Sequence, residues 1–506
     1  MKSLETVAKG AGLVFFGMII SKLLGYLYRL IIARIGTQEY GLLSIGFAVI
    51  GIVVVLALLG LDAGVVRYVA YFKGKNDKAR IKGVIVDALR ISLPLSILFG
   101  IVMYLSADYM ANSIFHNAEL SFIIKIFSFT IPFYTLSRVA LAALKGFQRI
   151  EYEIYSRSIF ENLARIILTL LVLYLGYSLF GAAIAYMVSI VLMSFLAFYY
   201  LERKVFPFLK DHFKTIYSSK ELISYSWPLM FSSLLYLVIV WTDILMIGYF
   251  KDVANVGIYN AALPTADLML VVPVALISLF TPVITELFAK KKNEDINRVY
   301  KTTTKWIFFI NLPIFLIMIF FSKAILNILF GSDYVSGASS LMVLASGYLI
   351  GVMFNTSEGI LNMIKRSRLI LFNAAVAAVV NIILNYILIP RYGIVGGAFA
   401  TGVAIILYGI LCGAEAYYLT KMQPLKLSYL KGIIAGGISI LAVVYFVKLL
   451  FKGMQLILFI GVFLVFISLY LGLLILFKSF EEDDKSILDA IEEKGFKVGF
   501  LRRIIK

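Results

Sequence analysis

Seven charged side chains lie inside long apolar stretches of this 506-residue chain, and their signs are sorted along the sequence. The cations come in the first half and the carboxylates in the second: Lys22, Arg29, Arg138 and Arg165, then Asp243, Asp267 and Glu358. A charge at membrane depth is costly, so it usually faces a cavity or a partner and marks a pathway. Guanidinium groups match phosphate oxygens with two hydrogen bonds, and lysine adds a point charge. The pattern favours a transporter of an anion, with the four cations as candidate phosphate ligands.

Each of these cations also has a structural interpretation. Lys22 and Arg29 share one helical face, and Lys22 is the deeper of the two. Lys22 could instead form a buried ion pair, and Arg29 could reach the membrane surface. Glu161 precedes Arg165 by one helical turn, the order that favours an ion pair, which need not keep Arg165 from lining a cavity. Polar neighbours of Arg138 indicate access to water.

Further charged side chains could guard or drive transport. Arg67 and Lys125 lie nearer the ends of their apolar stretches, as candidates for a cavity entrance or as groups that reach the membrane surface. Asp243, Asp267 and Glu358 are candidates for ion coupling, because carboxylates take protons or Na⁺, or for gating by pairing with the cations of the first half. Amide oxygens of one later stretch add to the possible ion ligands: Asn373, Asn381 and Asn385.

Catalytic chemistry finds little support in the sequence. There is no Walker loop for ATP, and one cysteine and two histidines give no basis for a disulfide framework, a redox pair or a metal cluster. The loops on the predicted outer side are too short for a glycosyltransferase or ligase domain. We expect no enzyme activity and no cofactor, apart from a possible coupling Na⁺ or H⁺.

Composition and hydropathy define the elements that must position these groups. Hydrophobic residues make up 61% of the chain and charged residues 15%, against about 25% charged in soluble domains. A membrane-spanning helix needs about 20 mostly apolar residues. We place spans near 11–34, 40–66, 83–105, 119–143, 155–176, 180–201, 224–250, 256–284, 302–321, 338–363, 369–389, 394–419, 428–450 and 454–477. The sequence predicts an all-α integral membrane protein with about fourteen transmembrane helices.

The loops alternate in charge. Connections after even-numbered spans are basic, as at Lys73–Lys82 and Lys290–Arg298, and the others carry few basic residues. Positive charge gathers on the cytoplasmic side, so both termini are predicted to be cytoplasmic. Most of the net charge of +18 is therefore loop charge, which argues for orientation rather than for nucleic-acid binding.

The first two blocks of six spans resemble each other at an offset of about 216 residues. Tyr40-Gly41-Leu42 aligns with Val256-Gly257-Ile258, and the basic loops from Lys73 and Lys290 align as well. Parallel repeats predict two lobes with a site between them. We expect an N-terminal lobe over 1–215, a second lobe over 216–425, two extra helices over 426–478, and a cytoplasmic tail over 479–506 that ends in a basic patch.

Ordered motifs give this chain a resemblance to a known family. They are Glu39-Tyr40-Gly41; Gly60-Leu61-Asp62-Ala63-Gly64 with Arg67; Ala143-Leu144-Lys145-Gly146-Phe147-Gln148-Arg149; and Asp243 through Val256-Gly257-Ile258-Tyr259-Asn260-Ala261-Ala262. With the two six-span repeats and two extra spans, residues 5–477 resemble the polysaccharide (oligosaccharide) flippases of the multidrug/oligosaccharidyl-lipid/polysaccharide superfamily. The resemblance implies a V-shaped pair of lobes around a cationic cavity.

The resemblance also implies a function. Such proteins move lipid-(di)phosphate-linked glycans from the cytoplasmic to the outer leaflet by alternating access, which would place this chain in the plasma membrane as a multi-pass flippase for polysaccharide or glycan biosynthesis. We expect a lipid-linked glycan substrate, a monomer, and possible cooperation with glycan-assembly enzymes. A peptidoglycan-precursor flippase would share the cationic first lobe. A drug or cation exporter would need an acidic, aromatic cavity, against which the deep cations argue.

Overall fold

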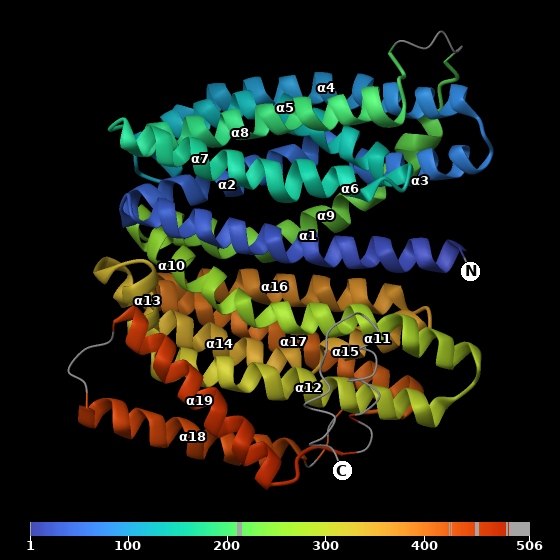
Figure 1. Ribbon diagram of the computed structural model, residues 1–506. Helices are drawn as coiled ribbons and strands as arrows, with labels where there is room; N and C mark the ends of the chain where they lie inside the picture. Colours follow the sequence, from blue (N-terminus) through green and yellow to red (C-terminus); the bar gives the residue numbers. More distant parts are fainter. Residues whose placement is uncertain are drawn as a thin grey trace. The chain divides into compact units, whose positions relative to one another are not determined.

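The computed structural model describes residues 2–209, 215–424, 426, 428–450, 455–481 and 484. Every regular element among these residues is a helix, and they contain no strand (Figure 1). The helices are α1 (Lys2–Ala33), α2 (Thr37–Leu58), α3 (Leu61–Gly74), α4 (Lys78–Tyr109), α5 (Glu119–Gly146), α6 (Ile150–Glu153), α7 (Glu161–Tyr174), α8 (Leu179–Tyr199), α9 (Ser219–Phe250), α10 (Val253–Ala266), α11 (Val271–Ala289), α12 (Asn293–Phe320), α13 (Ser322–Leu329), α14 (Ala338–Val352), α15 (Asn355–Met363), α16 (Ser367–Tyr392), α17 (Ile394–Thr420), α18 (Ser428–Leu450) and α19 (Leu456–Leu476). Short π-helical segments continue or precede some of them: η1 (Met110–Ile114), η2 (Ile154–Phe160) and η3 (Tyr200–Val205). Two further segments are 3₁₀-helical: η4 (Asp267–Leu270) and η5 (Ser332–Gly337).

The all-α membrane architecture is confirmed. Among the described residues, 11 helices are long and apolar enough to cross a membrane, or up to 12 with α9, which bends by 43°. The predicted spans near 11–34 and 155–176 fall on α1 and on η2 with α7, outside that set. The exact number of spans and the side of the termini therefore stay predictions.

One predicted span is broken where the sequence reads as continuous. The span near 40–66 divides into α2 and α3, because Leu59 and Gly60 adopt positive φ angles of 50° and 71°. A positive φ ends an α-helix and suits glycine. A β-carbon on Gly60 would also lie 2.4 Å from the Ser226 carbonyl oxygen of α9. The break thus lets α9 approach closely.

Helix boundaries follow the predicted repeat. Helices α1 and α9 begin at Lys2 and Ser219, 217 residues apart, and α2 and α10 begin at Thr37 and Val253, 216 apart. The last residues of α5 and α15, Gly146 and Met363, are 217 apart. These three boundaries therefore recur at the offset of the sequence repeat.

The contacts divide the chain into unit 1 (Met1–Asn260) and unit 2 (Ala261–Lys506). Helix α9 begins the second repeat in sequence, yet it packs on α2, α3 and α4 in unit 1. The predicted lobe boundary at 215 lies where the second sequence repeat begins. That the two transport lobes divide at this position stays a prediction.

Equivalent residues of the two repeats meet inside unit 1, where α2 and α10 begin. A β-carbon on Gly41 would lie 1.9 Å from the Val253 carbonyl oxygen, and one on Gly257 would lie 1.9 Å from the Thr37 carbonyl oxygen. Glycine allows helix backbones in membranes to approach this closely. Nearby, the Asn260 amide donates to the hydroxyl of Ser44, its equivalent 216 positions earlier. Residues at equivalent positions of the two repeats therefore contact each other reciprocally.

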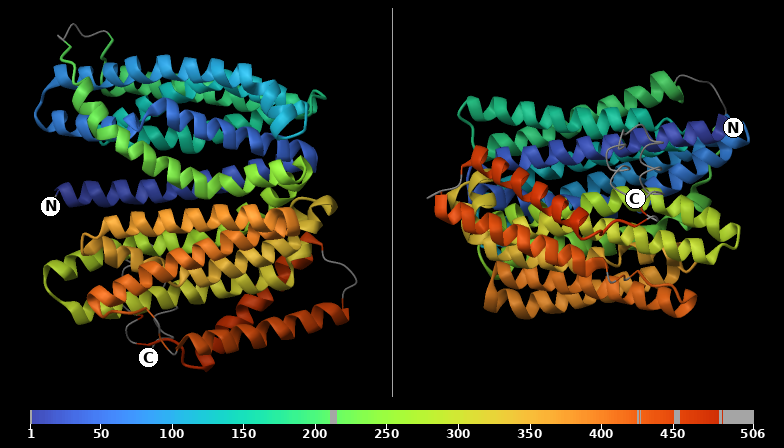
Figure 2. Two further views of the ribbon diagram at one scale, coloured as in Figure 1. Left: turned by 180° about the vertical axis from the view of Figure 1, so that it is seen from behind. Right: turned by 60° about the horizontal axis from the view of Figure 1, so that its bottom comes forward.

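In unit 2, α18 packs along α12, and α19 packs on α18 (Figures 1 and 2). The end of the described chain is fixed at the same place. The fully buried Lys305 Nζ lies 2.6 Å from Asp484 Oδ2, and Trp306 Nε1 donates to Asp484 Oδ1 at 2.9 Å. Burial acts to raise the pKa of the Glu481 carboxyl. The positive charges of Lys426, Lys305 and Lys431 outweigh burial and hold that pKa below its ordinary value. The rest of the predicted tail, including its basic patch, lies outside the described residues.

Candidate functional site

Lys22 and Arg29 lie on α1 without an acidic partner among the described residues. Lys22 is exposed and forms no hydrogen bond or ion pair there. Arg29 donates to the Asn260 amide oxygen at 3.1 Å and to the Tyr40 hydroxyl at 3.4 Å. Neutral partners orient a guanidinium group without cancelling its charge. These two side chains, two helical turns apart, therefore keep their positive charge for a ligand.

Arg165 of α7 is enclosed instead. Its guanidinium pairs with Glu161 one turn earlier and lies over the rings of Tyr28 and Tyr186, at 5.2 and 4.6 Å. Only 13% of the Arg165 side chain is exposed. The predicted ion pair is present, and it neutralises the cation locally. Arg165 could bind an anion only if the anion replaced Glu161 or bound the guanidinium beside it.

Arg138 of α5 lines a pocket of about 200 Å³ between α3, α5, α6 and η2. Asp62 pairs with Arg138 across this pocket. Lys145 and Glu153 form a second ion pair at its edge, at 2.8 Å, and Arg157 adds a further cation. Three cations and two carboxylates line the pocket, so it keeps a net positive charge. Access of water to Arg138 stays a prediction.

The two entrance candidates have different surroundings. The Arg67 guanidinium lies 4.1 Å from the centre of the Tyr225 ring and is exposed. Lys125 pairs with Asp108 at 2.8 Å. Asp62, which lies five residues before Arg67, pairs with Arg138 rather than with either of these cations. An entrance role for Arg67 and Lys125 stays a prediction.

The three predicted carboxylates share one feature, which is that each accepts a hydrogen bond from a tyrosine hydroxyl. Tyr259 donates to the buried Asp243 at 2.5 Å in unit 1, and in unit 2 Tyr348 donates to Asp267 at 2.5 Å. Tyr408 donates to Glu358 at 3.0 Å. A tyrosine can orient a carboxylate for an ion or for a gate, so both interpretations remain open.

Sequence reasoning missed several polar side chains. Glu415 of α17 accepts a hydrogen bond from Asn373, and Lys305 of α12 carries a buried charge. Lys145 and Arg157, which were not among the candidate site residues, line the Arg138 pocket. A single charge near a span end looks like a surface group, so hydropathy alone gives no signal for these positions. Spacing on the helix face was the available clue, since Tyr408, Cys412 and Glu415 follow one another at intervals of four and three residues.

Comparison with known families matches residues 7–288 to the polysaccharide biosynthesis protein family. This chain belongs to that family. Residues 228–387 also match the MatE family. The predicted family resemblance is confirmed, and the chain is a multi-pass membrane protein.

Relatives extend the likeness to most of the chain. An uncharacterized membrane protein of Methanocaldococcus jannaschii is 26% identical, over 87% of this chain and 90% of its own. A probable low-salt glycan biosynthesis flippase of Haloferax volcanii is 26% identical, over 42% of this chain and 44% of its own. The structure of the lipid II flippase MurJ in an inward closed conformation has a TM-score of 0.69 at 17% identity, over 92% of this chain and 98% of its own. At that identity the MurJ likeness concerns the fold.

Proposed function

We propose that this protein is a flippase that moves a lipid-(di)phosphate-linked oligosaccharide from the cytoplasmic to the outer leaflet by alternating access. Its family is described by polysaccharide biosynthesis, and one relative is named as a probable glycan biosynthesis flippase. The work of such a protein is transport without a covalent step, so we assign no catalytic group.

The observation that carries this proposal is the pair of uncompensated cations on α1. A lipid-linked glycan crosses the membrane only if its charged phosphates leave water, and a cation at the same depth offsets that cost. Lys22 is exposed, and Arg29 is held by two neutral groups. Arg29 can place two hydrogen bonds on one phosphate while Lys22 adds a point charge to the next.

The paired cations have a supporting role in this proposal. Arg138 and Arg165 are each neutralised by a carboxylate, so they bind phosphate less strongly than Lys22 and Arg29 in this state. If a phosphate enters the Arg138 pocket during transport, the ion pair between Asp62 and Arg138 must break. Exchange of an internal carboxylate for a substrate phosphate keeps binding reversible, which a transporter needs in order to release its cargo.

Energy coupling and location complete the proposal. Asp243, Asp267 and Glu358 are the candidate sites for Na⁺ or H⁺, or for gating. We place the protein in the plasma membrane, as a monomer that works beside glycan-assembly enzymes. A peptidoglycan-precursor flippase is the alternative, because its substrate carries the same diphosphate, and a direct comparison of the two substrates separates them.

The test uses the full-length chain in proteoliposomes with a fluorescent lipid-diphosphate oligosaccharide. Lys22→Gln and Arg29→Gln should each lower the rate of translocation about 10- to 100-fold, since a charge-assisted hydrogen bond contributes about 1.5–3 kcal/mol. The exposed Lys323 of α13 provides the control, and Lys323→Gln should transport at the wild-type rate. Wild-type rates in both α1 variants would contradict the proposal. Faster flipping of a peptidoglycan precursor than of the oligosaccharide would favour the alternative.

A further inference from the structure

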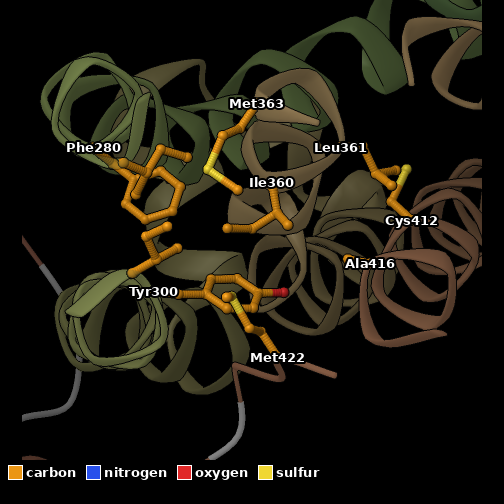
Figure 3. Close-up of a cluster of buried hydrophobic side chains, with 10 residues drawn as sticks. Phe280, Tyr300, Ile360, Leu361, Met363, Cys412, Ala416 and Met422 are labelled. Carbon is orange, nitrogen blue, oxygen red and sulfur yellow. The ribbon is translucent and has the colours of Figure 1, made fainter. Parts of the chain in front are cut away.

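A polar cluster that the proposed phosphate site does not use joins three helices of unit 2. Asn373 of α16 donates from Nδ2 to Glu415 Oε2 at 2.8 Å and contacts Cys412 Sγ at 3.5 Å. One helical turn before Cys412, Tyr408 donates to Glu358 of α15 at 3.0 Å. Both carboxylates are near enough to Cys412 to act on it electrostatically. Figure 3 shows Cys412 beside Leu361 within an apolar cluster, so this polar group has apolar surroundings.

Charge is not balanced in this cluster. Glu358 and Glu415 are half-buried, and neither forms an ion pair with any residue that the structure describes. Helix α14 adds only Tyr348 as a titratable group, and Glu286 of the neighbouring α11 pairs with Lys290. Helix α12 carries the cations Arg298, Lys301 and Lys305; Lys305 pairs with Asp484, and none of the three forms an ion pair with Glu358 or Glu415 among the described residues. Two negative charges in an apolar setting repel each other and are poorly solvated. The cluster therefore lacks a compensating positive charge.

Asn373 indicates where that charge belongs. The residue is fully buried, and its Oδ1 has no hydrogen-bond partner among the described atoms, while its Nδ2 already bonds to Glu415. An unpaired buried carbonyl oxygen costs about 1–3 kcal/mol. An amide and a carboxylic acid can form two hydrogen bonds side by side, with N–H donating to the carboxyl oxygen and O–H donating to the amide oxygen. A proton on Glu415 would supply the missing donor and remove one of the two negative charges.

The cluster lies near one end of its helices. Glu358 and Glu415 are each five residues before the ends of α15 and α17, and Asn373 is six residues after the start of α16. At 1.5 Å per residue, the three side chains lie roughly 8 Å from these helix ends. This is the end that carries Lys365, Arg366 and Arg368, which the charge pattern assigns to the cytoplasm. Water on that side can therefore exchange a proton with the cluster.

We propose that Glu415 and Asn373 form a proton-binding site in unit 2, with Glu358 as the second carboxylate that disfavours the empty, doubly charged state. The proton comes from water at the basic end of unit 2, binds a Glu415 oxygen, and is held by donation to Asn373 Oδ1. Asn373 acts as a positioning residue. Coupling of this proton to glycan movement rests on the proposed function, whereas proton binding does not.

Infrared titration of the full-length protein in nanodiscs without substrate tests the site directly. In the pH range where exposed carboxylates are already ionised, above about pH 6, the wild type should still show the carbonyl band of a protonated carboxylic acid. This band should disappear as the pH rises further, and Glu415→Gln should lack it. Asn373→Leu should keep the band but change its frequency and midpoint pH, because the partner oxygen is gone. Glu294→Gln, at an exposed carboxylate of α12, should leave the spectrum unchanged. A wild-type band that survives Glu415→Gln would overturn the proposal.

A second arm identifies the ion and separates this inference from the proposed function. The titration is repeated in Na⁺ and in choline, and we expect the same midpoint. Loss of the band on adding Na⁺ at constant pH would show a Na⁺ site and overturn the proton assignment. In proteoliposomes, translocation by the wild type should respond to a pH gradient and that by Glu415→Gln should not. Wild-type translocation with no titrating band refutes only the proton site, and a titrating band without any translocation refutes only the flippase function.

Discussion

At the scale of single residues, the partners of a membrane cation decide what it can do. Lys22 and Arg165 look alike in a hydropathy profile, because each is one cation in an apolar helix. The structure separates them: Lys22 has no partner among the described residues, and Arg165 has Glu161 and two aromatic rings. The uncompensated charge of Lys22 can bind a substrate reversibly, whereas the enclosed Arg165 stabilises the packing of unit 1.

This difference gives a prediction for Arg165. Arg165→Met should lower the stability of the protein by about 3–5 kcal/mol, because it leaves Glu161 buried without its partner. The double variant Arg165→Met, Glu161→Gln should recover most of that loss. Thermal unfolding in detergent measures both, with Glu286→Gln at an exposed pair as a control that should change little.

The same variants test whether Arg165 is also a phosphate ligand. If the double variant transports glycan at the wild-type rate, Arg165 serves the structure alone. If it is stable but inactive, Arg165 takes part in binding. Equal destabilisation by the single and double variants would contradict the ion-pair interpretation.

At the scale of elements, the contact between α2 and α10 carries the repeat symmetry. Gly41 and Gly257 are equivalent in sequence, and each brings its helix within van der Waals reach of the other backbone. The Arg29 guanidinium binds Asn260 and Tyr40 at the same junction, so the helix contact also orients a proposed phosphate ligand. A change in the contact between α2 and α10 should therefore alter the position of the Arg29 guanidinium.

We predict that Gly41→Ala and Gly257→Ala each reduce both thermal stability and translocation, to a similar extent. A β-carbon at either position would lie 1.9 Å from a carbonyl oxygen, so the helices must move apart. Gly74 at the end of α3 is the control, because nothing lies within 4 Å of a β-carbon there, and Gly74→Ala should be neutral or slightly stabilising. Wild-type behaviour of both alanine variants would show that the close approach is not needed.

At the scale of the whole molecule, the orientation in the membrane rests on loop charge. The basic loops alternate along the chain, so a single rule assigns every loop to a side. Cys412 is the one cysteine of the chain, and it is buried. The wild type should thus give little background in a labelling experiment.

Single-cysteine scanning tests this orientation. In intact cells, a membrane-impermeant maleimide should label Lys251→Cys and Ser332→Cys from outside. Lys75→Cys and Lys291→Cys should react only after the membrane is permeabilised. All four positions are exposed, so accessibility from one side is what differs between them. The opposite pattern would invert the predicted topology.

Much of the architecture follows from local sequence. Apolar length places the helices, since a segment of about 20 apolar residues has few other solutions in a membrane. The 216-residue repeat and the deep cations are also visible in the sequence, and so is the Glu161–Arg165 pair, because one helical turn joins its members.

Only the tertiary structure decided which of these groups remain free and which are neutralised. Asp62 and Arg138 are 76 residues apart, and Glu415 and Asn373 are 42 apart, so no local rule could pair them. The break at Gly60 and the packing of α9 within unit 1 likewise depend on contacts between distant segments. A helix fixes its own hydrogen bonds and the face on which a side chain lies, but the neighbour on that face is set by packing. The sequence therefore determined the helices and their charges, and the fold determined which charges are left to bind a phosphate or a proton.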